Sequence, residues 1–449
     1  MATTVPSKLL STLSQAADIV RGHDFINVFS HYDADGVSAA SIVAKALIRA
    51  GKEFRITLFT TLNDQNMKTI ANTKAECILI TDLGASYIDQ LDQLSCDVIV
   101  LDHHTVISEA KRVCYANPHL YGIDGMTSGC GATMAFLFSV ALDEGNWDLV
   151  QIAFAGIAGD RQHIKGLTGL NAYLLEEGVA RGFIEEAQGS LIPSGKLSES
   201  LFLCTDPYIR GVTGNRDGVS RILADAGVPE DADYRSLNDE QRRRLSSLIA
   251  VKITQQGVLE VSMQEIARKR YYLKGLGMDA EQLSGILNSC GRAGVGGMGV
   301  SAGLGDRDAL EKGAAIDRDS AGLLVEAMCT LDSIGLNQME NIQWFDSSDS
   351  GFTGMLCGIA MQCIGDPSKP TIGVNKSYDP VNLSSRGMWI QLDAGVDLAV
   401  AMREACASVG GEGGGHRIAA GGSVPADSID QFLRNLDEIV GKQKLAASR

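Results

Sequence analysis

The sequence lacks the segments that would place it in a membrane or build a disulfide framework. It has no apolar run long enough to span a bilayer and no charged-then-apolar signal segment at its start. Its ten cysteines are widely separated and include no C-x-x-C pair, which excludes the spacing of a zinc ribbon. We therefore expect reduced, mostly buried thiols in a cytoplasmic protein that does not act on membranes.

Positive charge is also scarce in this chain. Lys and Arg number 39 against 55 Asp and Glu, which gives a net charge of −16 at pH 7. A protein that coats DNA needs a basic surface, because contacts to phosphates supply that affinity. The charge disfavours such a role but leaves open phosphoester chemistry that works through bound divalent cations. At 449 residues the chain is long enough for two domains and a smaller module.

Apolar runs and helical patterns alternate through the first part of the chain. Short β-branched-rich runs lie at 25–30, 54–60, 77–81 and 97–101. Helical patterns lie at 8–22, 37–50, 128–142 and 147–158. This β-α-β-α order is typical of a doubly wound parallel sheet with helices on both faces. We predict an N-terminal α/β domain of this type over residues 1–183.

The remainder predicts two further parts. Residues 184–343 read as a mostly helical intermediate module, with a polar helix at 237–257 and a glycine-rich connection at 288–305. That connection is rich in apolar residues, which favours close backbone packing or a substrate-facing loop over a flexible linker. Residues 344–449 alternate apolar runs, at 371–374 and 388–392, with helical stretches that end in a helix at 429–440. This predicts a smaller C-terminal α/β domain, with a cleft between it and the first.

Acids and imidazoles follow three of the predicted strands at the point where each strand ends. The first strand leads into His31-Tyr32-Asp33-Ala34-Asp35, the third into Asp82, and the fourth into Asp102-His103-His104. The carboxyl ends of parallel strands meet at one edge of the sheet, where ligands bind. Asp160, just after a predicted helix, offers another carboxylate. Taken singly, each aspartate is more often a helix cap, but their convergence predicts a metal site.

The residue types indicate which metal this site would take. Oxygen and nitrogen ligands without thiolates favour Mn²⁺ or Mg²⁺ over structural zinc. Asp33 and Asp35 lie two apart and can face different ions, while Asp82 can bridge them. Two such ions about 3.5–4 Å apart clamp the attacking and leaving oxygens of an in-line displacement at phosphorus. Asp102 is then expected to orient the imidazole of His103.

Several segments carry a resemblance to a known family. SHYDADG, TDLG, LDHH and GIAGD, in that order, resemble the four motifs of the DHH phosphoesterase superfamily. The C-terminal GGGHRIAAGG resembles the glycine-rich motif of its companion DHHA1 domain, and NSCGR, SSRG and DPYIRGVTG are similar to features of archaeal RecJ-like exonucleases. The resemblance spans nearly the whole chain. It implies an α/β fold and phosphodiester hydrolysis with two divalent cations, Mn²⁺ first and Mg²⁺ second.

The resemblance also implies roles for the residues that match the N-terminal motifs. It implies six metal ligands: His31, Asp33, Asp35, Asp82, His103 and Asp160. Many superfamily members place the first histidine four residues before the first aspartate, where this chain has Phe29, so His31 follows the archaeal-type spacing. His104 matches a position near the scissile phosphate, where it donates a hydrogen bond or proton. We therefore predict a catalytic role for His104 and Asp102.

A substrate clamp is implied in the C-terminal domain. Glycines let the backbone approach a phosphate, and charged side chains hold it. The implied residues are Arg386, Gly414, Gly415 and His416, with Arg292 as a further phosphate contact. The alternative for the glycine run is a tight turn between packed elements. The basic and aromatic string at 268–272 is either a contact to a single strand or a solvated helix face, and His163 is a candidate for the surroundings of the metal ligands.

Three functions remain open at this point. The first is a RecJ-like exonuclease that degrades single-stranded DNA or RNA with a metal-activated water, as in DNA repair or replication. The second is a phosphodiesterase for oligonucleotides or other small phosphoesters, which the acidic charge favours slightly. The third, which some archaeal relatives suggest, is a component of the replication machinery that associates with the GINS complex, with or without nuclease activity.

Overall fold

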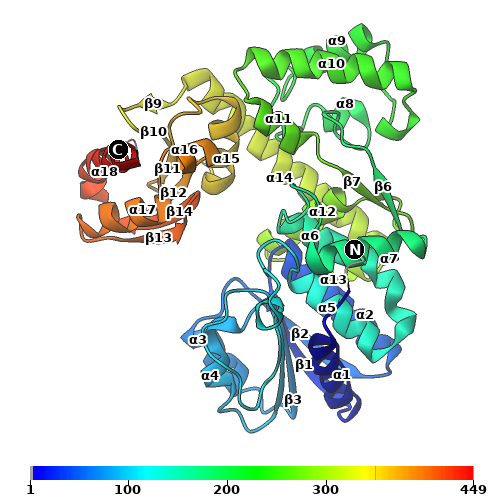
Figure 1. Cartoon of the computed structure of the whole chain (residues 1–449). Coiled ribbons are helices and arrows are strands. Elements are labelled where there is room, and N and C mark those ends of the chain that lie inside the picture. Colours follow the sequence, from blue (N-terminus) through cyan, green and yellow to red (C-terminus); the bar gives the residue numbers. More distant parts are fainter. Residues whose placement is uncertain (1–3, 349, 448–449) are drawn as a thin grey trace. The chain divides into compact units, whose positions relative to one another are not determined.

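The computed structural model describes residues 4–348 and 350–447 (Figure 1). The chain divides into two compact units, and each unit is built from two separate stretches of sequence. The first unit comprises residues 1–189 and 268–320, and the second comprises residues 190–267 and 321–449. The sequence predicted three consecutive domains. They remain a prediction, because the two units are defined by compactness and not by function.

The first unit contains the predicted parallel sheet. Its five strands are β1 (Phe25–His31), β2 (Glu53–Phe59), β3 (Cys77–Thr81), β4 (Asp97–Leu101) and β5 (Cys114–Ala116). Their order is β2-β1-β3-β4-β5, and every neighbouring pair is parallel. The strand order therefore reverses between β1 and β3. In open α/β sheets the crevice at such a switch point, beyond the carboxyl ends of the strands, is the usual ligand site.

Both faces of this sheet are covered, which explains the continuous apolar runs. On one face, Leu79, Ile99 and Leu101 belong to a core formed with helices. On the other face, Ile80 and Val100 belong to a second core. Successive side chains of a strand point to opposite faces, so a strand buried on both sides must be apolar throughout.

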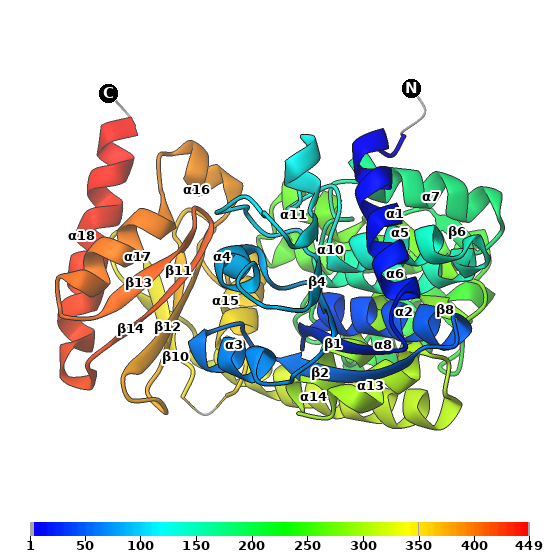
Figure 2. The ribbon, with the colours of Figure 1, turned by 90° about the horizontal axis from the view of Figure 1, so that it is seen from below.

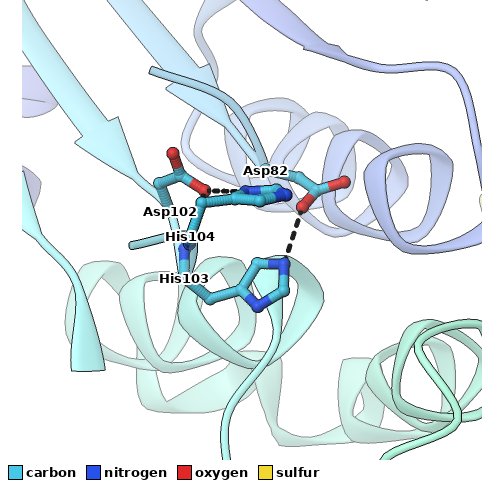
Figure 3. Close-up of side chains that lie close together, drawn as sticks. All are labelled: Asp82, Asp102, His103 and His104. Carbon is cyan, nitrogen blue, oxygen red and sulfur yellow. Dashed lines mark hydrogen bonds and ion pairs between the residues drawn. The ribbon is translucent and has the colours of Figure 1, made fainter. Parts of the chain in front are cut away.

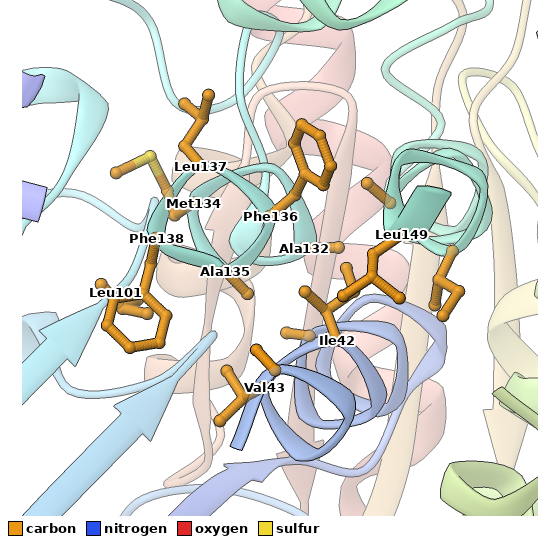
Figure 4. Close-up of a cluster of buried hydrophobic side chains, with 14 of the residues drawn as sticks. Ile42, Val43, Leu101, Ala132, Met134, Ala135, Phe136, Leu137, Phe138 and Leu149 are labelled. Carbon is orange, nitrogen blue, oxygen red and sulfur yellow. The ribbon is translucent and has the colours of Figure 1, made fainter. Parts of the chain in front are cut away.

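The helices of the first unit pack around this sheet. They are α1 (Ser7–Arg21), α2 (Ala34–Arg49), α3 (Asp64–Ala71), α4 (Ile88–Leu91), α5 (Gly131–Leu142), α6 (Val150–Gly159), α7 (Gly169–Ala180), α12 (Ala280–Arg292) and α13 (Gly296–Gly303), with short 3-10 helices η1 (Ala85–Tyr87), η2 (Pro118–Tyr121) and η3 (Glu144–Leu149). The centre of the larger core lies where α2 meets α5, with Ile42 and Val43 against the α5 side chains (Figure 4). Almost every side chain of α2, α5 and α6 is buried, so the loops at their ends are anchored by rigid elements.

The glycine-rich connection at 288–305 forms closely packed helices. Close backbone packing was one of the two alternatives predicted from its sequence. A Cβ added at Gly291 would lie 1.7 Å from the carbonyl oxygen of Tyr32, and one at Gly303 would lie 2.3 Å from Oγ of Ser41. The glycines of α12 and α13 thus allow the close approach of these helices to β1 and α2. The segment is not a loop, so the substrate-facing alternative is wrong for most of its length.

A small antiparallel sheet marks where the chain leaves the first unit and returns to it. Its strands are β6 (Ile184–Ala187), β7 (Arg270–Leu273) and β8 (Met278–Asp279), in the order β6-β7-β8. The basic string at 268–272 therefore ends in a strand, and the helix-face alternative is wrong. Lys269 bonds Glu186, and the buried ring of Tyr271 packs on Phe154 with 5.2 Å between ring centroids. That tyrosine is not available to stack on a nucleic acid base.

The second unit begins with helices. They are α8 (Leu197–Ser200), α9 (Arg216–Ala226), α10 (Asp239–Gln255) and α11 (Glu260–Ile266), with the 3-10 helix η4 (Tyr234–Ser236). Helix α14 (Arg307–Ile334) is continuous from the first unit into the second. Apolar side chains of this helical segment, of the end of α14 and of α15 (Thr353–Cys363) share one core. None of the helices in the described residues has both the length and the apolar character needed to cross a bilayer.

A six-stranded mixed sheet completes the second unit. Its strands are β9 (Asn337–Gln338), β10 (Gln343–Asp346), β11 (Thr371–Asn375), β12 (Val381–Arg386), β13 (Glu412–His416) and β14 (Ala419–Val424), in the order β13-β14-β12-β11-β10-β9. Its further helices are α16 (Trp389–Asp393), α17 (Leu398–Ala407), η5 (Ala426–Ser428) and α18 (Ile429–Ala447). Helices α17 and α18 cover one face, while α15 packs on β11 and β12 (Figure 2). The apolar run at 388–392 belongs to α16, so it adds no strand to this sheet.

Candidate metal centre

The loop after β1 supplies the first group of polar side chains. Asp33 caps α2, because its Oδ1 accepts the backbone N–H of Gly36 at 3.0 Å. Asp35 lies in the first turn of α2 and is buried, and its carboxylate accepts the N–H groups of Gly131 and Ala132 at 2.6 and 2.9 Å. Those two donors belong to the N-terminus of α5, whose dipole stabilises a negative charge. The local fold therefore holds both carboxylates at the sheet edge.

Asp82 follows β3 and has an unusual backbone. Its φ is 55°, in the left-handed region that few non-glycine residues adopt, although Asp and Asn enter it most readily. The side chain is buried and its two oxygens face different histidines. Oδ2 lies 3.5 Å from Nδ1 of His31, and Oδ1 lies 3.2 Å from Nε2 of His103. One carboxylate oxygen of Asp82 thus lies beside each of the two imidazoles.

Backbone carbonyls orient the rings of both of these histidines. Nε2 of His31 donates to the carbonyl of Thr60 at 3.2 Å, and Nδ1 of His103 donates to the carbonyl of Gly125 at 2.8 Å. The other nitrogen of each ring faces the carboxylates, and it would offer a lone pair to a cation once the imidazole is neutral. Nε2 of His103 lies 3.4 Å from Oδ2 of Asp160.

Asp102 does not hold the ring of His103, which corrects the sequence-based expectation. Its Oδ1 instead accepts Nδ1–H of His104 at 2.8 Å and the backbone N–H of His103 at 2.7 Å (Figure 3). Oδ2 accepts the backbone N–H of Ala85 at 2.7 Å. The buried Asp102 therefore fixes the turn after β4 and orients His104, whose side chain is 49% exposed. His104 is the accessible member of the His103-His104 pair.

The structure brings all six predicted metal ligands together in the first unit. Two groups consist of these ligands alone and have ligand atoms within 4.8 Å of one another: His31, Asp33 and Asp82, and Asp35, His103 and Asp160. A third group joins Asp82 and His103 to Asp102 and His104. Asp82 also lies beside the second group through its contact with His103. Oxygen and imidazole nitrogen donors in this number suit Mn²⁺ or Mg²⁺ and exclude a thiolate site.

The charge balance of the cluster supports occupation by a cation. Burial, together with the charges of Asp82 and Asp160, raises the pKa of Asp35 well above its usual range. Burial likewise raises the pKa of Asp160 to about 6. Burial opposes the charged form of His31, but Asp33 and Asp82 outweigh it and raise its pKa to about 11. The groups thus hold extra protons to limit mutual repulsion, and divalent cations would replace those protons.

One residue of this centre was missed from the sequence. Gln162 is buried, and its side-chain amide donates to the carbonyl of Gly125 at 2.9 Å and to Oδ2 of Asp160 at 3.3 Å. Its position two residues after Asp160 is its only sequence signal. His163, which was a candidate for these surroundings, instead places Nε2 2.7 Å from Oε1 of Glu281.

The predicted substrate residues of the C-terminal domain lie in the second unit. The glycine run at 412–416 is strand β13 at the edge of the sheet, so it is not a tight turn. Ala419 pairs with Arg386 on one side and with His416 on the other, which puts these two charged or polar residues in one row across three strands. Gly414 has open space where a Cβ would lie. Arg292 is exposed at the end of α12 and belongs to the first unit.

Family models match both ends of this architecture. Residues 25–157 match the DHH family N-terminal domain, and residues 351–442 match the DHHA1 domain. The chain belongs to the DHH/DHHA1 family. Among curated proteins, this DHH/DHHA1 chain is 29% identical over 434 residues to an uncharacterized protein of Methanocaldococcus jannaschii, with 95% of each chain covered.

Solved structures of low sequence identity share the fold of this DHH/DHHA1 protein. A manganese-bound exonuclease RecJ matches with a TM-score of 0.60 and 16% identity, covering 99% of this chain and 98% of its own. RecJ from Thermus thermophilus in complex with Mn²⁺ matches at 0.61 and 16%, covering 98% of this chain and 56% of its own. CDC45 from Entamoeba histolytica matches at 0.63 and 11%, covering 96% of this chain and 99% of its own. The RecJ-like fold expected from the motifs is confirmed.

Proposed function

We propose that this protein is a metal-dependent phosphodiesterase of the RecJ type, which removes nucleotides from single-stranded DNA or RNA. The observation that carries the proposal is the placement of Asp82, whose two carboxylate oxygens face His31 and His103 in two separate ligand groups. Such a bridge supports a centre with two divalent cations, Mn²⁺ or Mg²⁺. Bound there, the cations would lower the pKa of a water and stabilise negative charge on the phosphoryl oxygens.

The residues around the cluster support hydrolysis rather than storage of a metal. His104 is half-exposed beside the ligands, and its hydrogen bond to Asp102 raises its pKa although burial opposes this. A protonated His104 can donate to a phosphate oxygen or to the leaving oxygen. In the second unit, Arg386 and His416 would hold a nucleotide phosphate by charge-assisted hydrogen bonds, with the bare backbone of Gly414 allowing close approach. A Cβ at Gly415 would instead lie 2.7 Å from Cα of Ala420, so this glycine allows close pairing with β14.

Asp82→Asn tests the proposal on end-labelled single-stranded DNA and RNA with Mn²⁺ or Mg²⁺. Asparagine keeps the left-handed backbone of residue 82 but removes the bridging charge, so we expect hydrolysis to fall by roughly a thousandfold or more. Asp92→Asn is the matched control, because Asp92 accepts three backbone N–H groups in the same unit but lies outside the cluster. Near-normal hydrolysis by Asp82→Asn would refute the two-metal assignment.

Cleavage of dinucleotides and co-purification with GINS subunits, measured beside this assay, separate the alternative functions. A phosphodiesterase for small substrates cleaves dinucleotides faster than long strands, and the row of Arg386 and His416 would then serve a single nucleotide. A GINS-associated component without nuclease activity cleaves neither substrate but co-purifies with GINS subunits. The convergence of all six ligand side chains favours a hydrolase over a component without nuclease activity.

A further inference from the structure

We propose that Gln162 is a positioning residue that sets the geometry of two metal ligands at once, and thereby the affinity of the centre for Mn²⁺. The inference rests on the metal centre of the proposed function and concerns a residue outside its ligand set. Gln162 lies in the turn after α6, with its backbone N–H bonded to the carbonyl of Ile157 at 3.1 Å. Arg161, the residue before it, has a left-handed φ of 56°. This helix-ending turn sends the side chain of Gln162 back toward Asp160.

The orientation of the Gln162 amide follows from its partners. Oε1 accepts the backbone N–H of Gly129 at 3.1 Å and the Nδ2–H of Asn171 at 2.7 Å. Asn171 is oriented in turn by the hydroxyl of Thr133, which donates to its Oδ1 at 2.7 Å. The Nε2 group of Gln162 must therefore face the two acceptors on its other side.

Those two acceptors are the link to the metal ligands. One is Oδ2 of Asp160, at 3.3 Å, and the other is the carbonyl of Gly125, at 2.9 Å. The same carbonyl accepts Nδ1–H of His103 at 2.8 Å. The buried amide of Gln162 thus restrains both the carboxylate of Asp160 and the carbonyl of Gly125, which orients His103. Loss of such outer contacts typically weakens metal binding by roughly 10- to 100-fold.

Gln162→Glu is the sharpest variant, because it keeps the shape and the acceptor but replaces the donor with an oxygen. That oxygen would face the Gly125 carbonyl and Asp160, which both repel it. We expect the Mn²⁺ dissociation constant of the purified full chain, measured by calorimetric titration, to rise at least about 10-fold. Excess Mn²⁺ should restore hydrolysis, which is the signature of weakened metal binding rather than unfolding.

The chain offers a matched control in Gln151. This glutamine of α6 has the same 7% exposure as Gln162, and its Oε1 accepts the backbone N–H of Gly275 at 2.6 Å. Gln151→Glu should lower stability without changing the Mn²⁺ dissociation constant. Gln162→Met, which removes the hydrogen bonds but keeps the length, replaces Gln162→Glu if the latter does not fold.

The outcomes distinguish this inference from the proposed function. If the wild type binds no Mn²⁺, the metal centre itself is wrong. If the wild type binds Mn²⁺ and a folded Gln162 variant binds it equally well, only the role of Gln162 is wrong. That role is also wrong if Gln151→Glu weakens Mn²⁺ binding as much, or if neither Gln162 variant folds.

Discussion

At the scale of single residues, two acids of the first unit show how neighbours decide the state of a carboxyl group. Asp35 is surrounded by other carboxylates, and its pKa is raised by burial and by Asp82 and Asp160. Glu281 is partly buried, but His163 and Arg268 outweigh that burial and lower its pKa. The charged form of Asp35 needs a cation to be stable, while the charge of Glu281 is already neutralised by the protein.

Glu281 gives a prediction about stability against pH. Its folded-state pKa is lowered, so its contribution is present above the unfolded pKa and is lost as pH falls toward the folded value. Glu281→Gln should lower the free energy of unfolding by about 1 kcal/mol at pH 7, a modest figure because 33% of the side chain is exposed and solvent screens the pair. The difference from wild type should shrink below about pH 4.5 and vanish in stronger acid.

Urea unfolding in the presence of EDTA measures this difference without metal binding. Glu177→Gln is the control, because Glu177 pairs with Arg181 one turn away on the surface of α7 and should contribute little at any pH. A destabilisation by Glu281→Gln that grows as pH falls would contradict the lowered pKa of Glu281.

The sequence predicted the charged residues of the centre better than the groups that orient them. Asp33, Asp82 and His103 could be found because each follows a strand whose pattern is visible. The carbonyl of Gly125 and the amide of Gln162 have no such signal, because any residue has a carbonyl and most glutamines are solvated. The partner of Asp102 was assigned to the wrong histidine, since the choice between adjacent imidazoles depends on side-chain rotation.

At the scale of elements, local helix propensity and tertiary packing disagree most in the glycine-rich helices α12 and α13. Glycine disfavours a helix interior, so the sequence predicted a connection over 288–305 rather than α12 and α13. The structure needs glycine there because Gly291 and Gly303 have no room for a Cβ. The parallel strands, in contrast, were predicted with bounds close to those observed, because burial on both faces leaves a continuous apolar run.

A pair of alanine substitutions in α13 tests this account. Gly303→Ala should destabilise the protein by roughly 1–3 kcal/mol, because its Cβ would meet Oγ of Ser41 at 2.3 Å. Gly297→Ala, in the same helix and with nothing within 4 Å, should stabilise it by up to about 1 kcal/mol through helix propensity alone. Thermal unfolding of both variants makes the comparison, and equal effects would mean that close packing is not the reason for Gly303.

At the scale of the whole molecule, the units are not consecutive in sequence. Residues 268–320 form one compact unit with residues 1–189, and residues 321–449 form the other with residues 190–267. The boundaries predicted from the sequence lie where the composition changes. A pairing such as β6 with β7, two short strands that lie far apart in the chain, has no pattern in the sequence, since such strands form only through tertiary contacts.

The location of the metal centre predicts where Mn²⁺ should stabilise the molecule. Binding at a concentration roughly 100 times the dissociation constant adds about 2.7 kcal/mol to the state that binds. Hydrogen exchange should therefore slow in the first unit, at the ends of β1, β3 and β4 and in the turn after α6. Exchange in β11, β12 and β14 should not change, and Asp82→Asn should remove the effect. Equal slowing in both units would show that Mn²⁺ acts outside the proposed centre.

The pairing of Ala187 with Arg270 has a consequence for how the chain is connected. The polypeptide exits and re-enters the first unit through two neighbouring strands, so the stretch between them is an excursion whose ends are already joined. Apolar side chains of this excursion share one core with the end of α14 and with α15. Shortening the excursion would therefore expose part of the core of the second unit, while the parallel sheet keeps its own connectivity.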